Sequence, residues 1–369
     1  MTPVCEGFGM IGLHWKIISL IAGLTLLGLA PACLAAGNGT AEHRAAAANE
    51  ILLDNHRIVN MLDDVLAFYD QAASESLARQ RLLWKRTVER KYSDFFNRAV
   101  FRNADQDLRL AMVDRFLELL PERIDQVRQY NQTAAENVYQ ALLNFKYRFP
   151  DYKQQRDIYI GISLFTFDGT VRAVNNDLGL PDTLCLGADV LSGYGLDQSK
   201  IVMVHELFHL YHYNILLGSA FHLARAGLVF NHDIFTHMIA AYVPLMVEGM
   251  AVAASEQIYP GFPGTMYIHF TPEELDSQEA NLVDNAQAFL NMMREGYLPY
   301  QYEKWFSGTY DGIPKRGGYL LGYEVTKRAL SGATLDQLAR MTPSQLGQEA
   351  EAQLSAIVTS GLVVMAGGQ

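Results

Sequence analysis

The most informative stretch of this sequence is VMVHELFHL, at residues 202–210. Its apolar residues surround the polar ones, which predicts a buried helix. On a helix, His205 and His209 stand four residues apart and project from one face, so both imidazoles can reach a single ion. Glu206 lies about 100° around the helix from His205, beside that ion, where its carboxylate can take a proton from water. The alternative interpretation is a half-buried helix whose histidines make ordinary hydrogen bonds.

A third metal ligand is expected further along the chain. A catalytic zinc site needs three protein ligands and an open fourth position. The metzincin arrangement would place Gly at 212 and His at 215, but the sequence has His212 and Ile215. The other common solution is a glutamate from a following helix, and VEGMAVAAS at residues 247–255 supplies Glu248. His212 shares the metal-facing stripe, and we interpret it as a packing residue or as a hydrogen-bond partner of the ligands.

The surroundings of Glu248 support its choice as the ligand. Pro244 suits the first turn of a helix, which puts Glu248 early in that helix. Small residues near it would let this helix approach the histidine helix closely: Gly249, Ala251, Ala254 and Ser255. Glu256 and His237 are rival ligands, but neither has such small neighbours.

Residues 1–36 have the features of a secretory signal peptide. Lys16 precedes an apolar run at residues 17–30, and small residues follow that run. We expect cleavage after Ala35 or Ala36, and export to the periplasm or to the outside of the cell. Two alternatives stay open: Cys33 could carry a lipid, or the segment could be retained as a membrane anchor.

Composition narrows the classes of function. The chain has 369 residues, half of them hydrophobic, and a formal net charge of −11. Such an acidic chain would be repelled by nucleic acid, so we expect no nucleic-acid partner. Of the three cysteines, only Cys185 would remain after the leader is removed, which excludes an internal disulfide. We interpret Cys185 as a small core residue.

The pattern predicts an α+β fold that is mostly helical. In residues 37–150, apolar residues recur at three- and four-residue spacings, which predicts a helical N-terminal region. Helices are expected over residues 55–72 and 105–120, and Pro121 falls where a new helix could start. Residues 151–369 are expected to form the catalytic domain.

A small sheet is expected at the start of the catalytic domain. Residues 158–162 and 164–167 are rich in β-branched and aromatic residues, and Asp168-Gly169 predicts a hairpin turn after them. The chain would then return as a strand over residues 170–174. A further strand is expected at 183–187, followed by the histidine helix, which Asp197 or Ser199 would cap near Lys200.

Four motifs occur in order between Leu184 and Tyr323: LGAD at 186–189, HELFH at 205–209, EGMA at 248–251 and GYLLGY at 318–323. This order resembles the gluzincin superfamily of HExxH metallopeptidases, and most of all the predicted zinc-dependent proteases of bacterial envelopes. The resemblance implies a zincin-like domain with zinc as cofactor and a peptide or protein as substrate. It also implies that the strand near Leu186 pairs with an extended substrate backbone.

The two tyrosines of the last motif are candidates for catalysis. Peptide hydrolysis passes through a tetrahedral oxyanion, which a phenol can stabilise by donating a hydrogen bond. Tyr319 and Tyr323 are four residues apart and would share one face of a helix, with Gly318 and Gly322 allowing close approach. We prefer Tyr319 as the donor. The alternative for either residue is an aromatic side chain that packs in the core.

The chain departs from the gluzincin pattern at one position. Many members carry an aspartate four residues after the ligand glutamate, where this chain has Val252. The residue that orients a ligand histidine must then come from elsewhere, and Asp189 or a backbone carbonyl are the candidates. The aminopeptidase motif is also absent, so cleavage at chain ends and cleavage within chains both stay open.

These residues predict a zinc-dependent peptidase with Glu206 as general base and His205, His209 and Glu248 as ligands. The alternative is a non-catalytic envelope protein, a scaffold or adaptor that keeps a metal site for stability. The acidic surface, the long helical region and Val252 favour that alternative.

Overall fold

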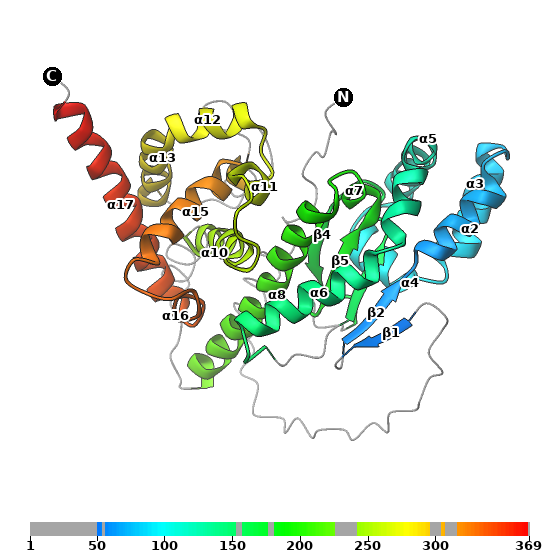
Figure 1. The fold of residues 1–369 in the computed structure, drawn as a ribbon, viewed down its shortest axis with the longest axis horizontal. Coiled ribbons are helices and arrows are strands. Elements are labelled where there is room, and N and C mark those ends of the chain that lie inside the picture. Colours follow the sequence, from blue (N-terminus) through cyan, green and yellow to red (C-terminus); the bar gives the residue numbers. More distant parts are fainter. Residues whose placement is uncertain are drawn as a thin grey trace.

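The computed structural model of this chain describes residues 50–53, 56–152, 157–175, 181–225, 242–295, 304–306 and 316–367. Most of these residues are helical, and the remainder includes one small mixed sheet (Figure 1). The predicted α+β class with a predominance of helix is therefore confirmed. The leader predicted at residues 1–36 lies outside the described residues. None of the described helices is both long and apolar enough to span a membrane.

The sheet has five strands in the order β1-β2-β3-β5-β4. The strands are β1 (Glu50–Leu53), β2 (His56–Asn60), β3 (Asp157–Gly161), β4 (Gly169–Arg172) and β5 (Thr183–Gly187). β2, β3 and β5 run parallel to one another, while β1 and β4 run antiparallel to their neighbours. Every residue of β5 is buried, including Cys185, as expected for a central strand that is covered on both faces.

The predicted hairpin between β3 and β4 is wrong, because β5 lies between them. Leu186 pairs with Ile160 of β3 on one side and with Gly169 of β4 on the other. β1 and β4 are the two edge strands among the described residues, and the strand near Leu186 has both edges occupied. β5 therefore cannot pair with a substrate, which corrects the expectation taken from the gluzincin resemblance.

A turn replaces the strand that was predicted at residues 164–167. Leu164 and Phe165 adopt left-handed conformations with φ of 56° and 58°. The carboxylate of Asp189 holds this turn by accepting hydrogen bonds from the backbone N–H groups of Ser163 at 2.8 Å and Phe165 at 2.6 Å. The buried carboxylate satisfies backbone groups that a strand would have paired within the sheet. This use of Asp189 argues against its predicted role as partner of a ligand histidine.

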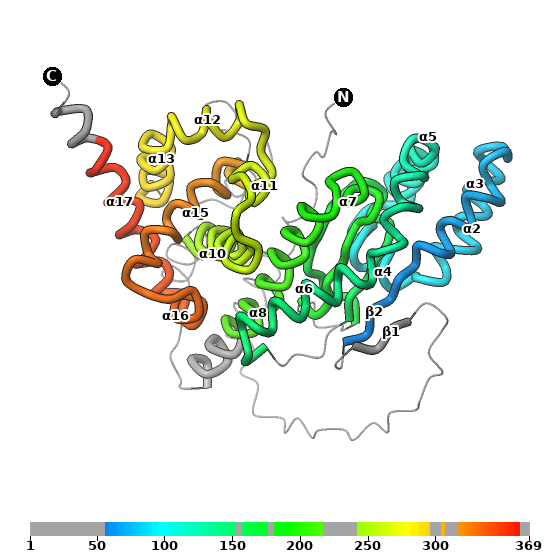
Figure 2. Tube along the Cα trace, in the orientation of Figure 1, coloured from blue at the N-terminus to red at the C-terminus, as the bar shows by residue number. Residues whose placement is uncertain are grey.

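The helix predicted over residues 55–72 is shorter than expected, because its first part is strand β2. Ile58 pairs with Ile158 in the parallel sheet. The helix α2 (Leu62–Ala72) begins after this strand, and the Asn60 side chain accepts a hydrogen bond from its first residue, Leu62 N, at 3.0 Å. Figure 2 shows β2 leading directly into α2. The apolar spacing fitted a helix, but pairing with β3 decided the conformation.

All regular elements described between α2 and β3 are helical, as predicted. The elements are α3 (Leu77–Trp84), a π-helical segment (Lys85–Glu89), α4 (Ser93–Phe95), a second π-helical segment (Phe96–Phe101), α5 (Gln106–Asn131) and α6 (Ala134–Arg148). Asp105 caps α5 by accepting a hydrogen bond from Leu108 N at 2.9 Å. Pro121 lies inside α5 and does not start a new helix, which corrects the prediction.

All regular elements described after β5 are helices. These are α7 (Ala188–Leu191), α8 (Leu196–Arg225), α10 (Tyr242–Ile258), α11 (Gly264–Ile268), α12 (Pro272–Ala280), α13 (Leu282–Glu295), α15 (Gly317–Ala329), α16 (Leu335–Ala339) and α17 (Pro343–Gly367). The histidine helix α8 starts four residues earlier than the predicted start near Lys200. In Figure 1, α8 runs between the sheet with α2–α5 on one side and α10–α17 on the other.

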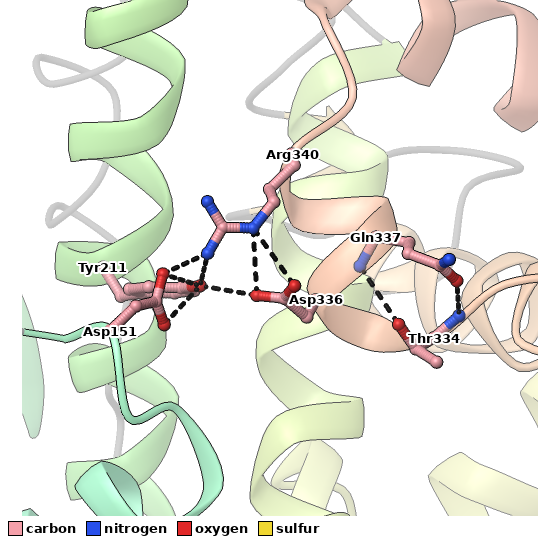
Figure 3. Close-up of polar contacts among 6 residues, drawn as sticks. All are labelled: Asp151, Tyr211, Thr334, Asp336, Gln337 and Arg340. Carbon is pink, nitrogen blue, oxygen red and sulfur yellow. Dashed lines mark hydrogen bonds and ion pairs between the residues drawn. The ribbon is translucent and has the colours of Figure 1, made fainter.

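A polar cluster on α8 ties these two sides together (Figure 3). The Tyr211 hydroxyl lies 3.1 Å from a carboxylate oxygen of Asp151, which follows α6, and 2.9 Å from one of Asp336 in α16. Arg340 binds both carboxylates. Tyr211 projects from the same helix as the metal-ligand candidates, so this cluster helps to fix the position of that helix.

Candidate metal centre

Two histidines of α8 and one glutamate of α10 converge in the interior. The Nε2 atoms of His205 and His209 are 2.9 Å apart. The Oε2 atom of Glu248 lies 3.3 Å from His205 Nε2 and 3.2 Å from His209 Nε2. Among the described residues, these three are the one group of acidic, histidine or cysteine side chains close enough to hold a metal ion. The structure therefore brings together the three ligands that the sequence predicted.

The spacing of these atoms fits a bound ion. Ligands about 2.0–2.1 Å from a tetrahedral ion stand roughly 3.3–3.4 Å apart, close to the separations seen here. Glu248 is fully buried, and its Oε1 atom has no hydrogen-bond partner among the described residues. A buried carboxylate oxygen without a partner is costly unless a cation compensates it. The His205 side chain is 13% exposed and His209 only 2%, so the group opens towards solvent at His205.

The charges of the group also suit a cation. Burial would raise the pKa of Glu248, but the two imidazoles hold it well below its ordinary range, so the carboxylate is ionised. Burial lowers the pKa of His205 and favours the neutral imidazole that binds metal. For His209, burial opposes protonation, but the Glu248 carboxylate raises its pKa overall. A proton shared by this pair would have to leave before an ion could bind.

The position of Glu248 depends on two different helix contacts. Ser255 Oγ donates a hydrogen bond to the carbonyl of Ile201, which holds α10 against α8. Gly249, however, faces α15: a Cβ there would come closer than 3.0 Å to the carbonyl oxygen of Gly322. The small residues after Glu248 thus allow close packing against two helices, α8 and α15. The sequence predicted that all of them would face the histidine helix. Glu248 itself lies in the second turn of α10.

Glu206 lies beside the ligands, at the start of the edge strand β4. Its side chain is 7% exposed, and a Cβ at Gly169 would come closer than 3.0 Å to Glu206 Cγ. Burial raises the pKa of Glu206 to about 7, and the carboxylates of Glu248 and Asp168 add to this effect. A carboxyl group with a pKa near neutrality can both accept and return a proton.

The two candidate tyrosines share helix α15, as predicted, but have different surroundings. The ring of Tyr319 stacks on His205, with centroids 6.4 Å apart. Burial and the Glu248 carboxylate raise the pKa of Tyr319, so its phenol stays protonated and can donate. Tyr323 donates a hydrogen bond to Glu256 at 2.5 Å instead. The structure therefore places Tyr319 beside the candidate ligand His205. Tyr323 is bound instead to Glu256, the residue that the sequence offered as a rival ligand.

His212 is buried on α8, and neither ring nitrogen has a hydrogen-bond partner among the described residues. Its ring packs against Phe208 at 5.7 Å, and burial lowers its pKa to about 3. Of the two predicted roles, the structure supports packing. His237, the other rival ligand, lies outside the described residues.

The sequence reasoning missed several residues around the centre. Tyr213 stacks on His209 at 5.7 Å, and its position four residues further along α8 was the available signal. Arg316 lies over the ring of Tyr319, with its guanidinium carbon 4.3 Å from the centroid. Asp168 accepts a hydrogen bond from the Tyr194 hydroxyl at 3.3 Å. No local pattern could have placed Asp168 and Arg316, which are distant in sequence, beside one metal centre.

His269, which the sequence analysis did not single out, also lies close to these residues. His269 adopts a left-handed conformation at the end of α11, with φ of 62°. Its Nδ1 lies 3.4 Å from the Gln198 amide and 3.8 Å from an Asp168 carboxylate oxygen. Burial lowers its pKa to about 4, so its imidazole is neutral at physiological pH.

Comparison with protein-family models, with curated proteins and with solved structures found no match to this chain. The resemblance to gluzincins therefore stays a prediction that rests on the motifs themselves. What the chain has is a mostly helical α+β fold in which His205, His209 and Glu248 could together hold a metal ion.

Proposed function

We propose that this chain is a zinc-dependent peptidase that hydrolyses peptide bonds. The observation that carries the proposal is the convergence of His205, His209 and Glu248 with a buried Glu206 at their side. A set of two histidines and one carboxylate suits zinc and leaves a fourth position open. The signal peptide predicted at residues 1–36 would deliver the enzyme to the periplasm or beyond.

An ion in this site supplies Lewis acidity, which lowers the pKa of water and polarises a carbonyl group. The protein supplies the proton transfers. The Glu206 carboxylate, whose pKa burial raises in the metal-free chain, would take a proton from the attacking water and then give it to the leaving amine. Burial of Glu206 serves this role, because an ordinary exposed glutamate would be too weak a base at neutral pH.

Tyr319 is the donor that we assign to the developing oxyanion. Its ring stacks on His205, and its phenol is held in the protonated form. A donor aimed at the carbonyl oxygen contributes most in the transition state, when that oxygen becomes negative. Tyr323 is left out of this role because its hydroxyl already binds Glu256.

β4 is the element that we assign to substrate positioning. It is an edge strand among the described residues, and it begins at Gly169, directly over Glu206. Thr170, Val171 and Arg172 are buried and Gly169 is half-buried, so an extended peptide would meet this edge at Gly169, beside the proposed general base. The class of substrate, a peptide or protein chain, is the one that the gluzincin resemblance implies.

A non-catalytic metal-binding scaffold is the second candidate, and one observation favours it. His209 Nδ1 is buried without a hydrogen-bond partner among the described residues. Catalytic ligand histidines usually donate that proton to an acceptor, and Val252 stands where many gluzincins have one. A purely structural site would have four protein ligands, however, and three are found among the described residues.

The test is casein or peptide cleavage by the purified chain, with and without a chelator. We expect cleavage that 1,10-phenanthroline abolishes and added zinc restores. Glu206→Gln should keep one ion per chain and lose turnover by about 10²–10⁴-fold. Glu256→Gln is the matched control, a glutamate that accepts a hydrogen bond from Tyr323, and should keep both metal and turnover. If the wild-type chain cleaves nothing and chelation only lowers its thermal stability, the scaffold is the better assignment.

A further inference from the structure

Arg316 stands next to the candidate metal ligands and has no ion-pair partner among the described residues. Arg316 precedes α15 in a left-handed conformation, with φ of 56°. Among the described residues, no carboxylate oxygen lies within the 4.0 Å that defines an ion pair of this guanidinium. Its guanidinium carbon lies over the Tyr319 ring, 4.3 Å from the centroid, and the guanidinium also interacts with the Tyr319 hydroxyl as a hydrogen-bond donor. A guanidinium has five N–H donors, more than one phenol oxygen can accept, so donors of Arg316 are left for another acceptor.

Stacking connects this arginine to the ligands. The Tyr319 ring contacts both Arg316 and His205, and it stacks on the imidazole at a centroid distance of 6.4 Å. The charge of Arg316 acts on both His205 and His269, so it belongs to the same electrostatic site. A guanidinium already packed against an aromatic ring loses little additional freedom when it binds a planar anion.

The nearby carboxylate that could neutralise Arg316 is engaged elsewhere. Asp168 lies close enough to act electrostatically on Arg316. Its oxygens, however, accept from the Tyr194 hydroxyl at 3.3 Å and from Gly169 N at 2.7 Å, and one lies 3.8 Å from His269. With a divalent ion in the centre, the site would contain two cationic groups, the ion and the Arg316 guanidinium. An anionic group on the ligand would complement them.

We propose that Arg316 binds a carboxylate of the substrate, so that the preferred substrates are peptides with a carboxylate near the scissile bond. This inference rests on the proposed peptidase function. The guanidinium fork matches a carboxylate with two parallel N–H···O bonds, a geometry that lysine cannot reproduce. The carboxylate could be the C-terminus of the peptide, which would make the enzyme trim chain ends, or the side chain of Asp or Glu.

The first experiment compares two versions of one N-acetylated hexapeptide library, one with free C-terminal carboxylates and the other with carboxamides. Cleavage is followed by mass spectrometry with the zinc-loaded chain. We expect kcat/KM to favour carboxylate-containing peptides by about 10- to 100-fold, the worth of one charged hydrogen-bonded pair. A preference for the free-acid library identifies the terminus. A preference for Asp and Glu over Asn and Gln within the carboxamide library identifies the side chain.

Variants then assign the preference to the arginine. Arg316→Gln should remove the discrimination mainly through KM, and Arg316→Lys should restore part of it. Lys327→Gln is the matched control: Lys327 also belongs to α15 and lies over the ring of the other tyrosine, Tyr323, at 5.0 Å. This control should keep the full preference. Equal loss of activity on all peptides in Arg316→Gln, with the discrimination retained, would mean that Arg316 only positions Tyr319, and the inference would be wrong.

A binding experiment separates this inference from the proposed function. The zinc-loaded Glu206→Gln chain, with and without Arg316→Gln, is incubated with the same two libraries, and the retained peptides are identified by mass spectrometry. Retention of carboxylate peptides that depends on Arg316 supports the inference, even if the wild-type chain cleaves neither library and the peptidase proposal fails. Equal retention of carboxylate and amide peptides overturns the inference, even if the wild-type chain cleaves both.

Discussion

Gly249 of α10 packs directly on the backbone of Gly322 of α15. A Cβ at Gly249 would come closer than 3.0 Å to the Gly322 carbonyl oxygen, and a Cβ at Gly322 would come equally close to the carbonyl oxygen of Leu245. Gly249 follows Glu248, and Gly322 lies one turn beyond Tyr319. The contact between these two glycines therefore sets the distance between the helix with the carboxylate ligand and the helix with the candidate oxyanion donor.

Gly249→Ala should destabilise the chain and weaken metal binding together. The added methyl group meets backbone atoms, which cannot rotate away, so the two helices must separate at a cost of about 1–3 kcal/mol or more. Urea unfolding and metal content measure the two effects. Gly332→Ala is the control, because a Cβ there meets only one atom, at 3.9 Å. Wild-type stability and metal content in Gly249→Ala would show that the helices have room to move.

Metal content should distinguish two histidines of one helix. His209→Ala removes a ligand, so the purified variant should lose the one ion per chain that we expect in the wild type. His212→Leu replaces a buried imidazole that has no hydrogen-bond partner among the described residues, and this variant should keep the ion. Elemental analysis of both proteins decides the matter. Loss of metal from His212→Leu at normal stability would move His212 into the ligand set.

The two tyrosines of α15 should respond differently to loss of the hydroxyl group. Tyr319→Phe should lower kcat by about 10²–10³-fold, with little change in KM, because a donor to the oxyanion acts in the transition state. Tyr323→Phe removes the hydrogen bond to Glu256 and should instead reduce the free energy of unfolding by about 1–2 kcal/mol. Steady-state kinetics and urea unfolding measure both variants. A larger kcat effect at Tyr323 would reverse the assignment.

The buried carboxyl group of Asp189 should make stability depend on pH. Burial raises the pKa of Asp189 from 3.8 to about 6, although the N–H groups of Ser163 and Phe165 oppose this shift. The folded chain thus holds this proton more tightly than the unfolded chain does. The contribution to stability is full below pH 4 and is lost as the pH rises to about 6, on the order of 3 kcal/mol.

Asp189→Asn tests this expectation, because the amide does not titrate. The variant should be less stable overall, since an amide has one acceptor oxygen where the carboxylate offers two to the turn at residues 163–165. The difference between wild type and variant should grow in favour of the wild type between pH 6 and pH 4. Urea unfolding at four values from pH 4 to pH 7 gives this difference. Parallel curves for the two proteins would contradict the shifted pKa.

Short-range patterns predicted most of the helices and the three candidate metal ligands. The i, i+4 spacing of His205 and His209 required one helical face, and the structure has that face on α8. Strands at residues 157–161 and 183–187 were also recognisable, because β-branched and apolar runs of that length fit a buried sheet. Glu248 was found because a zinc site needs a third ligand, which limits the choice to few residues.

Two errors of the prediction share one physical origin. Residues 56–60 have apolar spacing that suits a helix, but hydrogen bonds to β3 make them a strand. Asp168-Gly169 is a strong hairpin signal, yet β4 pairs with β5, and a buried aspartate holds the turn before it. In each case a partner distant in sequence offered hydrogen bonds that local preference could not outweigh.

The sequence by itself determined the helix with its two histidines, Glu206 between them as the proposed general base, and the acid that would complete the ligand set. It could do so because these depend on helical geometry and on the ligand chemistry of zinc. Only the tertiary structure decided which strand forms the edge beside Glu206, which tyrosine faces the ligands and where Arg316 lies. These depend on contacts between segments far apart in the chain, and no local pattern encodes such contacts.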